Sequence, residues 1–442
     1  MRTKKFAAAA AVALTVALGM TACSSAGNAG AGGSGGTKAI GDVEGDGKTL
    51  TVWAMTGDYS DGTIAAINEQ FEKETGAKVK VQIQQWDGIT TKVSTALATN
   101  TPPDVIDLGN TQVASYAANG ALLDLTPYKK DLAQGQTWLD GLSDPATVDG
   151  SLYGVPGFAG ARSVIYNKQM WKDAGITSAP TTYEELTADL DKVKAKNSAS
   201  DFSAFYLPGQ YWYAGMQFVW DAGGEIATED GGKWKAGFGD AKAQQGLQDF
   251  KEFANAYSTK ASATLNTDSP DMTQVFADGK SSAILSTSGA LGLIEKANPK
   301  MTADALGTFP FPGKSGKTQP VMLGGSDWGI AAKSKNSDLA LAWVKIATSP
   351  DVQSKYVYGD TGWIPNSAEG IKAADSSLSE INKAFFTAAL NSKATPANAR
   401  WADLEGDLSI NDLFSSIVSG SKTPEQAAAT FDEAADSTLN KQ

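Results

Sequence analysis

The sequence contains no histidine and only one cysteine among its 442 residues. Without histidine, Ser-His-Asp and Cys-His catalysis and every His-ligated metal site are excluded, as is the side chain that usually titrates between pH 5 and 8. The single cysteine, Cys23, excludes a disulfide within the chain. No GxxxxGK[ST] motif occurs, so ATP hydrolysis through a P-loop is excluded as well. We therefore expect neither a cofactor nor a bound metal ion.

Basic residues are also scarce, with 37 Lys and Arg against 49 Asp and Glu. Removal of the first 22 residues, which contain Arg2, Lys4 and Lys5, changes the net charge from −12 to −15. Such a charge repels phosphate backbones, and the sequence has no basic patch, so no nucleic-acid partner is expected. The length and the 42% hydrophobic content predict a globular chain of two to three domains.

The N-terminus has the features of an export signal. A basic start is followed by an apolar stretch from Phe6 to Met20, which is too short to span a membrane, and then by two small residues and Cys23. Residues 1–22 resemble a bacterial lipoprotein signal peptide. The resemblance implies that Cys23 is lipidated and anchors the mature protein to the outer face of the cell membrane; the alternative is an ordinary secretory signal.

Residues 23–48 are rich in Gly, Ala and Ser and predict a flexible tether. Within them, Asp42, Glu44 and Asp46 match the first ligands of an EF-hand loop. Trp53 occupies the position where the bidentate glutamate is needed, so we favour a solvated acidic linker over a calcium site.

From residue 49 onward, strand patterns alternate with helix patterns. Apolar, β-branched runs predict strands at 49–55, 78–86 and 102–110, and amphipathic stripes predict helices at 63–75 and 89–98. This order is typical of an α/β fold with a parallel sheet covered by helices. Ligands of such folds bind in loops at the carboxyl ends of strands. Those loops contain Asp58, Tyr59, Trp86 and Asn110, which we take as candidate ligand contacts.

A second helix-rich region follows. Thr181 and Glu184 have the spacing of a capping box and predict the start of a helix at 180–196. Further helices are predicted at 241–256, 337–347, 349–358, 378–390 and 423–439.

Five segments together resemble the extracellular solute-binding proteins of carbohydrate ABC transporters, the family that includes maltose-binding protein. These are ALATNTPPDVIDLGN, YGVPGFAGARSVIYNK, FADGKSSAILSTSG, LGGSDWGIAAKSKN and DLALAWVKIATSPDVQSKYVYGDTGWIPN, in the family's order. The resemblance implies a two-lobed α/β fold, each lobe a mainly parallel sheet flanked by helices, with a ligand cleft between the lobes. It implies a monomer that binds an oligosaccharide and delivers it to the transmembrane permease subunits of an ABC importer.

Matching the segments also predicts the division of the chain into lobes. Lobe one is expected at 49–159 plus 286–333, and lobe two at 160–285 plus 334–442. The expected hinge elements are 157–162, 284–288 and 332–335.

A sugar site requires flat aromatic rings for the apolar faces of the pyranose and polar groups for its hydroxyls. Eleven tryptophans make such rings available, and several stand beside polar residues in predicted loops. The further candidate ligand contacts are Arg162, Trp212, Tyr213, Ser288, Asp327, Trp328, Trp363, Arg400 and Trp401. Core packing is the competing explanation for each aromatic residue, a backbone turn for Asp327 and a charge pair between the lobes for Arg162. Trp53, Trp171, Trp220 and Trp343 lie in strand or helix patterns and are assigned to the core.

Two other functions are compatible with the sequence. An exported glycoside hydrolase needs only two carboxylates, which the lack of histidine does not exclude. A receptor for a peptide or polyamine would share the architecture. For the sugar receptor, exchange of Trp212 for alanine is expected to remove most ligand affinity without changing the melting temperature.

Overall fold

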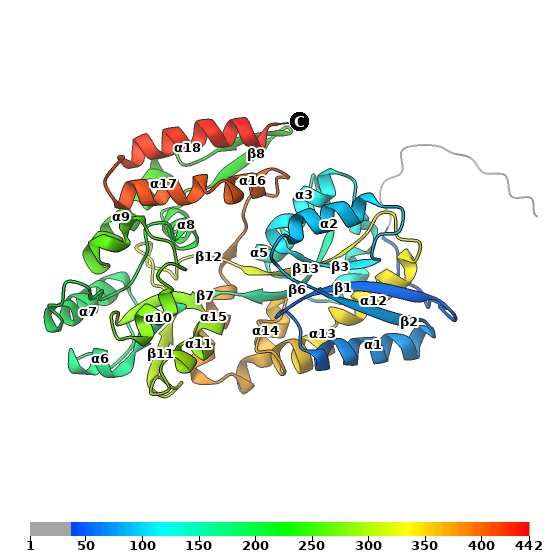
Figure 1. Cartoon of the computed structure of the whole chain (residues 1–442), viewed down its shortest axis with the longest axis horizontal. Helices are drawn as coiled ribbons and strands as arrows, with labels where there is room; N and C mark the ends of the chain where they lie inside the picture. Colours follow the sequence, from blue (N-terminus) through cyan, green and yellow to red (C-terminus); the bar gives the residue numbers. More distant parts are fainter. Residues whose placement is uncertain (1–36, 442) are drawn as a thin grey trace, which may run out of the picture. The chain divides into compact units, whose positions relative to one another are not determined.

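The computed structural model describes residues 37–441. Their buried apolar side chains form two separate cores, each beside its own sheet. We call the part around Leu50, Val105 and Trp343 the first lobe, and the part around Val164, Phe250 and Phe385 the second lobe. In Figure 1 the labels β1 to β3 mark the first lobe, and the labels α6 to α11 mark the second.

The first lobe is built from the N-terminal part of the described chain, up to β6, and from one later segment. Its elements are β1 (Thr49–Met55), α1 (Asp61–Thr75), β2 (Lys78–Gln84), α2 (Ile89–Ala98), β3 (Val105–Gly109), η1 (Asn110–Gln112), α3 (Val113–Ala118), η2 (Thr126–Tyr128), α4 (Lys129–Ala133), α5 (Asp140–Ser143), β4 (Thr147–Val148), β5 (Ser151–Leu152), β6 (Gly154–Gly160), β13 (Gly324–Ile330), α12 (Ser337–Ala347), α13 (Pro350–Val352) and the π-helical η4 (Gln353–Tyr358). The predicted strand and helix pattern at its start is confirmed.

Local sequence explains these first elements. In β1, Leu50, Val52 and Ala54 alternate with more exposed residues, as expected of a strand with one face in the core. In α1, Ile64, Ile67 and Phe71 form the buried stripe, and Gly76 ends the helix with φ 74°.

The second lobe contains the remaining elements. These are β7 (Arg162–Asn167), α6 (Lys168–Asp173), α7 (Tyr183–Lys196), α8 (Trp212–Asp221), β8 (Ala227–Asp230), β9 (Lys233–Ala236), α9 (Ala241–Tyr257), η3 (Lys260–Thr264), α10 (Met272–Ala277), β10 (Ala283–Thr287), α11 (Gly289–Ala297), β11 (Leu306–Phe309), β12 (Val321–Met322), α14 (Ala368–Ala374), η5 (Asp375–Ser377), α15 (Glu380–Ala389), β14 (Ser392–Lys393), α16 (Trp401–Gly406), α17 (Ser409–Val418) and α18 (Pro424–Leu439).

The first sheet is mixed and the second is antiparallel, whereas a mainly parallel sheet was predicted for each lobe. The first has the order β2-β1-β3-β13-β6, in which β1 pairs in parallel with β2 and β3, whereas β13 runs antiparallel to both β3 and β6. In the second, β7 lies between β10 and β11 and is antiparallel to both. The antiparallel partners of the first sheet, β6 and β13, are the strands that connect it to the second lobe.

In the described chain, three segments carry the backbone from one lobe to the other. Core membership changes at 158–159 within β6, between Leu323 and Trp328 at β13, and between Val357 and Ile364 after η4. In addition, Leu139 and Leu142 at α5 pack into the second core, although Trp138 and Ala146 on either side belong to the first. The three segments lie side by side, because β13 pairs with β6 and Ala159 exchanges two backbone hydrogen bonds with Ile364, at 2.9 and 3.0 Å. Gly325 is required here: its φ is 144°, and a Cβ atom would lie 2.1 Å from the Phe158 carbonyl oxygen.

These crossings differ from the predicted lobe boundaries. Residues such as Ile294 and Leu306 belong to the second core, and Trp343 and Val357 belong to the first, which reverses the assignment of 289–323 and 334–357. Of the expected hinge elements, 157–162 contains a crossing. Residues 284–288 lie in and after β10 within the second lobe, and 332–335 follow β13 within the first.

Part of the predicted tether, residues 23–48, contacts the first lobe. Residues 1–36, including Cys23 and most of the expected tether, lie outside the described residues. Residues 38–45, however, are attached to the first lobe. The Lys38 amide donates to the Pro127 carbonyl, the Ile40 amide donates to Asp131 Oδ2, and Ile40 and Val43 pack against the first core. Because this stretch is rich in acidic residues, we predicted a solvated linker and did not expect Ile40 and Val43 to pack against the core.

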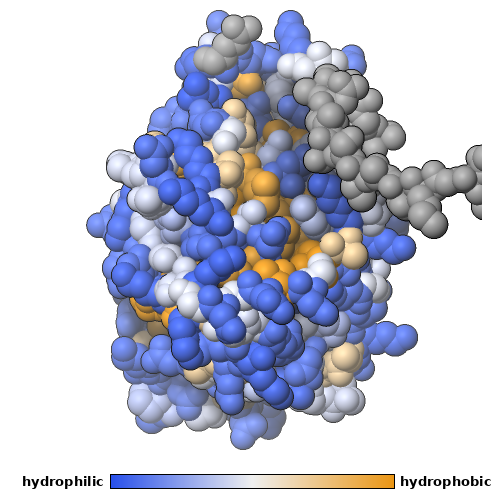
Figure 2. Space-filling model, turned by 90° about the vertical axis from the view of Figure 1, so that its right-hand side faces the viewer, coloured by the Kyte–Doolittle hydropathy of each residue, from blue (hydrophilic) through white to orange (hydrophobic). Residues whose placement is uncertain are grey.

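The face at the right-hand end of Figure 1 is turned towards the viewer in Figure 2, which shows apolar side chains in a hollow among hydrophilic ones. Among residues 37–441, no helix combines the length and the apolar character needed to cross a membrane.

The predicted capping box of α7 is displaced by one residue. Thr182 Oγ1 accepts from the Glu185 amide at 3.1 Å, and the Glu185 side chain accepts from the Thr182 amide at 3.3 Å. Both Thr181-Glu184 and Thr182-Glu185 have the required spacing, so the sequence pattern does not distinguish them.

We expect Thr182→Ala to lower the free energy of unfolding by about 1 kcal/mol, because it removes an N-cap. Thr181→Ala is the matched control, since its side chain caps no backbone amide and only donates to Glu185; its effect should stay within about 0.5 kcal/mol. Urea denaturation of both variants measures the difference, and a larger loss for Thr181→Ala would contradict the assignment.

Candidate functional site

Two buried carboxyl groups meet at the carboxyl edge of the first sheet. Asp58 follows β1 and accepts a hydrogen bond from Ser326 Oγ at 2.7 Å, and Asp107 Oδ2 in β3 accepts from the Met55 amide at 3.1 Å. Burial raises the pKa of Asp58 to about 6, although interactions with Ser326, Asp107 and Trp86 oppose the shift. Burial, and then the charge of Asp58, raises the pKa of Asp107 well above its usual value. Burial therefore favours the protonated form of both carboxyl groups.

Trp86 extends this group towards solvent. It follows β2, its side chain interacts with Asp58, and 38% of its surface is exposed, which is unusual for a tryptophan. A sugar site requires this combination, because an exposed ring can stack on the apolar face of a pyranose and a carboxyl group beside it can hydrogen-bond the hydroxyls.

Tyr59 belongs to a stack of rings beside the crossing segments. Its ring stacks on Trp328 with centroids 5.1 Å apart and meets the edge of Phe158 at 5.4 Å, and Phe158 stacks on Trp363 at 4.8 Å. Trp328 is fully buried and also packs against Trp343 at 4.8 Å. Trp328 thus supports the stack from the first core, while Tyr59 and Trp363 are half-buried.

Two polar candidates face the interior. Asn110 Nδ2 donates to the carbonyl oxygens of Gly141 and Leu323, at 3.2 and 3.0 Å, so its amide donors are already used. Asp327 is 0% exposed, and neither of its carboxyl oxygens has a partner among the described residues. Its side chain lies on the Gly154 side of β13, where a Cβ atom added to Gly154 would be 2.9 Å from the Asp327 Cβ. Asn110 and Asp327 therefore lie in the protein interior, whereas the prediction placed both in contact with ligand.

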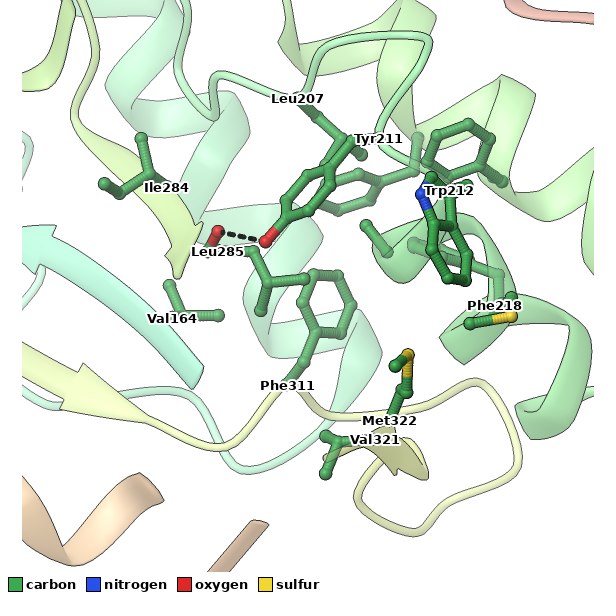
Figure 3. Close-up of a cluster of buried hydrophobic side chains, with 14 of the residues drawn as sticks. Val164, Leu207, Tyr211, Trp212, Phe218, Ile284, Leu285, Phe311, Val321 and Met322 are labelled. Carbon is green, nitrogen blue, oxygen red and sulfur yellow. Dashed lines mark hydrogen bonds between the residues drawn. The ribbon is translucent and has the colours of Figure 1, made fainter. Parts of the chain in front are cut away.

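A second group surrounds Arg162 at the start of β7. Arg162 Nε donates to the Tyr211 hydroxyl at 3.0 Å, and its guanidinium lies 4.0 Å from the centre of the Tyr213 ring. The Tyr211 hydroxyl in turn donates to the Leu285 carbonyl at 3.1 Å, as Figure 3 shows. Trp212 stacks on Tyr213 at 3.9 Å but is only 6% exposed, because it belongs to the buried cluster drawn in Figure 3.

The remaining candidates lie on α16 and α11. Trp401 is fully buried and donates its indole N–H to Glu405 Oε1 at 2.6 Å, while Arg400 is exposed and 3.7 Å from Asp403. Ser288 is half-buried at the N-cap position of α11 and makes no capping hydrogen bond.

Glu405 was missed by the sequence analysis. Burial raises its pKa to about 7, against the effects of Trp401 and of Thr111, which follows β3 in the first lobe. Its contact with Thr111 makes Glu405 a point where the two lobes touch. The sequence signal for Glu405 was its position four residues after Trp401, which places the two side chains on the same face of a helix.

The structure therefore brings the candidates together in two groups. Asp58, Tyr59, Trp86 and Trp363 belong to the first lobe and its crossings, and Arg162 and Tyr213 to the second. Trp212, Trp328, Trp401, Asn110 and Asp327 lie behind them as packing or buried polar residues. Among residues 37–441, no cluster of three or more Cys, Asp or Glu side chains could hold a metal ion.

Comparison with known proteins identifies related chains. The diacetylchitobiose binding protein DasA of Streptomyces coelicolor is 34% identical over 346 residues, which is 78% of each chain. The maltodextrin-binding protein MdxE of Bacillus subtilis is 24% identical over 74% of this chain and 75% of its own. The sugar-binding protein MalE of Xanthomonas citri has the same fold, with a TM-score of 0.77, 24% identity and coverage of 89% of this chain and 97% of its own.

The family model for bacterial extracellular solute-binding proteins matches residues 56–354, more than half of the chain. This match spans both lobes and the first two crossings, and it ends just before the third. The chain belongs to the family of bacterial extracellular solute-binding proteins.

Proposed function

We propose that this protein is the substrate-binding component of an ABC importer and captures an oligosaccharide between its two lobes. As a member of an extracellular family, it acts outside the cytoplasm. Its relatives DasA and MdxE are named for the sugars they bind, diacetylchitobiose and maltodextrin. The observation that carries the proposal in the structure is the exposed Trp86 ring beside the Asp58 carboxyl group at the carboxyl edge of a sheet.

In this proposal the crossing segments act as the hinge. Ligand bound to groups from both lobes stabilises the closed arrangement, so closure distinguishes a loaded receptor from an empty one. The receptor is a monomer that delivers the sugar to the permease subunits, and lipidated Cys23 ties it to the membrane. The lipoprotein-like signal of residues 1–22 supports this anchor.

Sugar hydrolysis is less well supported. A glycosidase places its two carboxyl groups at least about 5 Å apart, on opposite sides of the scissile bond. Asp58 and Asp107 instead interact directly with each other, leaving no room for a sugar between them. Incubation of the protein with a panel of oligosaccharides, followed by chromatography of the mixture, should therefore show no cleavage.

We expect calorimetry with a panel of oligosaccharides to find a ligand whose affinity falls about 10-fold or more in Trp86→Ala, because the ring supplies stacking area. The melting temperature of the empty protein should hardly change, because Trp86 is exposed. Trp234→Ala is the control: Trp234 lies on the β8–β9 hairpin, which contributes none of the site residues. If no oligosaccharide binds the unmodified protein, the proposed function is rejected.

A further inference from the structure

Arg162 has an unusual environment for a cation. It stands at the first position of β7, directly after the β6 crossing between the lobes. The Tyr213 ring covers one face of its guanidinium and the Tyr211 hydroxyl occupies its Nε, so the side chain is held in one orientation. Tyr211 is itself fixed by its bond to the Leu285 carbonyl. The donor geometry at this point is therefore prepared before any ligand arrives.

The two Nη nitrogens of Arg162 make no hydrogen bond within the described residues, where Nε alone has a partner. Of the two, Nη1 is also buried. Among residues 37–441, none of the ion pairs involves Arg162, so the competing explanation for this residue, a charge pair across the lobes, is not observed. A buried, charged donor without an acceptor is costly, and a cation–π contact compensates only part of that cost. Arg162 Nη1 therefore lacks an oxygen acceptor within the described residues.

The surroundings restrict the chemistry of that acceptor. Burial raises the pKa of the Tyr213 hydroxyl, the Arg162 charge lowers it, and the nearby charges of Glu405 and Asp268 raise it. Acidic side chains thus already lie near the Arg162 charge, so the missing partner of Nη1 need not be an anion. A neutral acceptor is sufficient, and the planar donor fork of a guanidinium suits an oxygen that accepts in one plane.

We propose that Arg162 is a specificity-determining residue that donates to the acetamido carbonyl oxygen of an N-acetylated amino sugar. The inference rests on the proposed function and narrows its substrate class. An amide carbonyl is a neutral, planar and strong acceptor, whereas a hydroxyl at the same position offers a weaker one. The charged donor should favour the acetylated sugar by about 10- to 100-fold in affinity.

The experiment uses three disaccharides with the same β-1,4 backbone: di-N-acetylchitobiose, its deacetylated form and cellobiose. Isothermal titration calorimetry on the full-length protein should show binding of di-N-acetylchitobiose about 10- to 100-fold tighter than of the other two. In Arg162→Gln this advantage should disappear, while the affinity for cellobiose stays unchanged. Lys192→Gln is the control for charge, because Lys192 is exposed on α7, which carries none of the candidate ligand contacts, and it should leave all three affinities unchanged.

Arg162→Lys keeps the charge but removes the planar fork, and it should lose most of the preference while retaining the fold. Its melting temperature and circular dichroism spectrum, measured beside those of Arg162→Gln, separate lost specificity from lost structure. Equal binding of all three disaccharides, a ligand without acetamido groups as the best binder, or an equal loss for all sugars in folded Arg162 variants would each overturn the inference and leave the proposed function intact. Failure of every oligosaccharide to bind would instead reject the proposed function.

Discussion

Replacement of Trp212 by alanine is expected to lower the free energy of unfolding by about 3–5 kcal/mol, the usual range for removing a buried tryptophan. The indole is 6% exposed, stacks on Tyr213 and meets the edge of Trp401 at 6.4 Å. Its removal leaves a cavity in the second core that these neighbours fill only in part. Guanidinium denaturation followed by circular dichroism measures the loss.

This result would differ from the sequence-based expectation, which had Trp212 exposed to ligand and neutral for stability. Trp86→Ala serves as the internal comparison, because its exposed ring should change the unfolding free energy by less than about 1 kcal/mol. If Trp212→Ala keeps its stability but no longer binds sugar, Trp212 contacts the ligand and its assignment to the core is wrong.

The second large effect concerns Asp327 and depends on pH. Burial raises the pKa of its carboxyl group well above the usual value in the folded protein, and neither oxygen has a partner among the described residues. In the unfolded chain the pKa is about 4. The native state thus keeps a proton that the unfolded state releases, so this group costs nothing below pH 4 and progressively more stability as the pH rises towards its folded pKa.

Asp327→Asn cannot ionise and should therefore gain stability relative to the unmodified protein by about 1.4 kcal/mol per pH unit between about pH 4 and the pKa of Asp327 in the folded protein. Denaturation curves at half-unit intervals from pH 4 to 8 measure this slope. Asp304→Asn, which changes an exposed aspartate, should show none. A pH-independent difference for Asp327→Asn would mean that Asp327 is ionised and solvated in the folded protein.

Local pattern was sufficient where one side of an element is buried. The alternation in β1 and the stripe Ile64, Ile67 and Phe71 in α1 depend on neighbours close in sequence, so both predicted elements are confirmed. The register of the α7 capping box was ambiguous because two overlapping Thr-x-x-Glu pairs exist.

The site was harder to predict because burial depends on contacts between distant residues. Trp212 is covered by Trp401, and Trp328 is covered by Tyr59 and Trp343. A tryptophan beside a polar residue in a loop has the same sequence pattern whether or not other aromatic rings pack over it in the folded protein. Asp107 and Glu405 were missed for the same reason, since their importance comes from Asp58 and Thr111 on other elements.

The arrangement of the three crossings limits how the lobes can move. A single connecting strand would let one lobe tumble about the other, whereas three passages hydrogen-bonded side by side must bend together. The bending freedom is then reduced to rotation about few axes. Little orientational entropy remains to be lost when a sugar draws the lobes together, so more of the contact energy is retained as affinity.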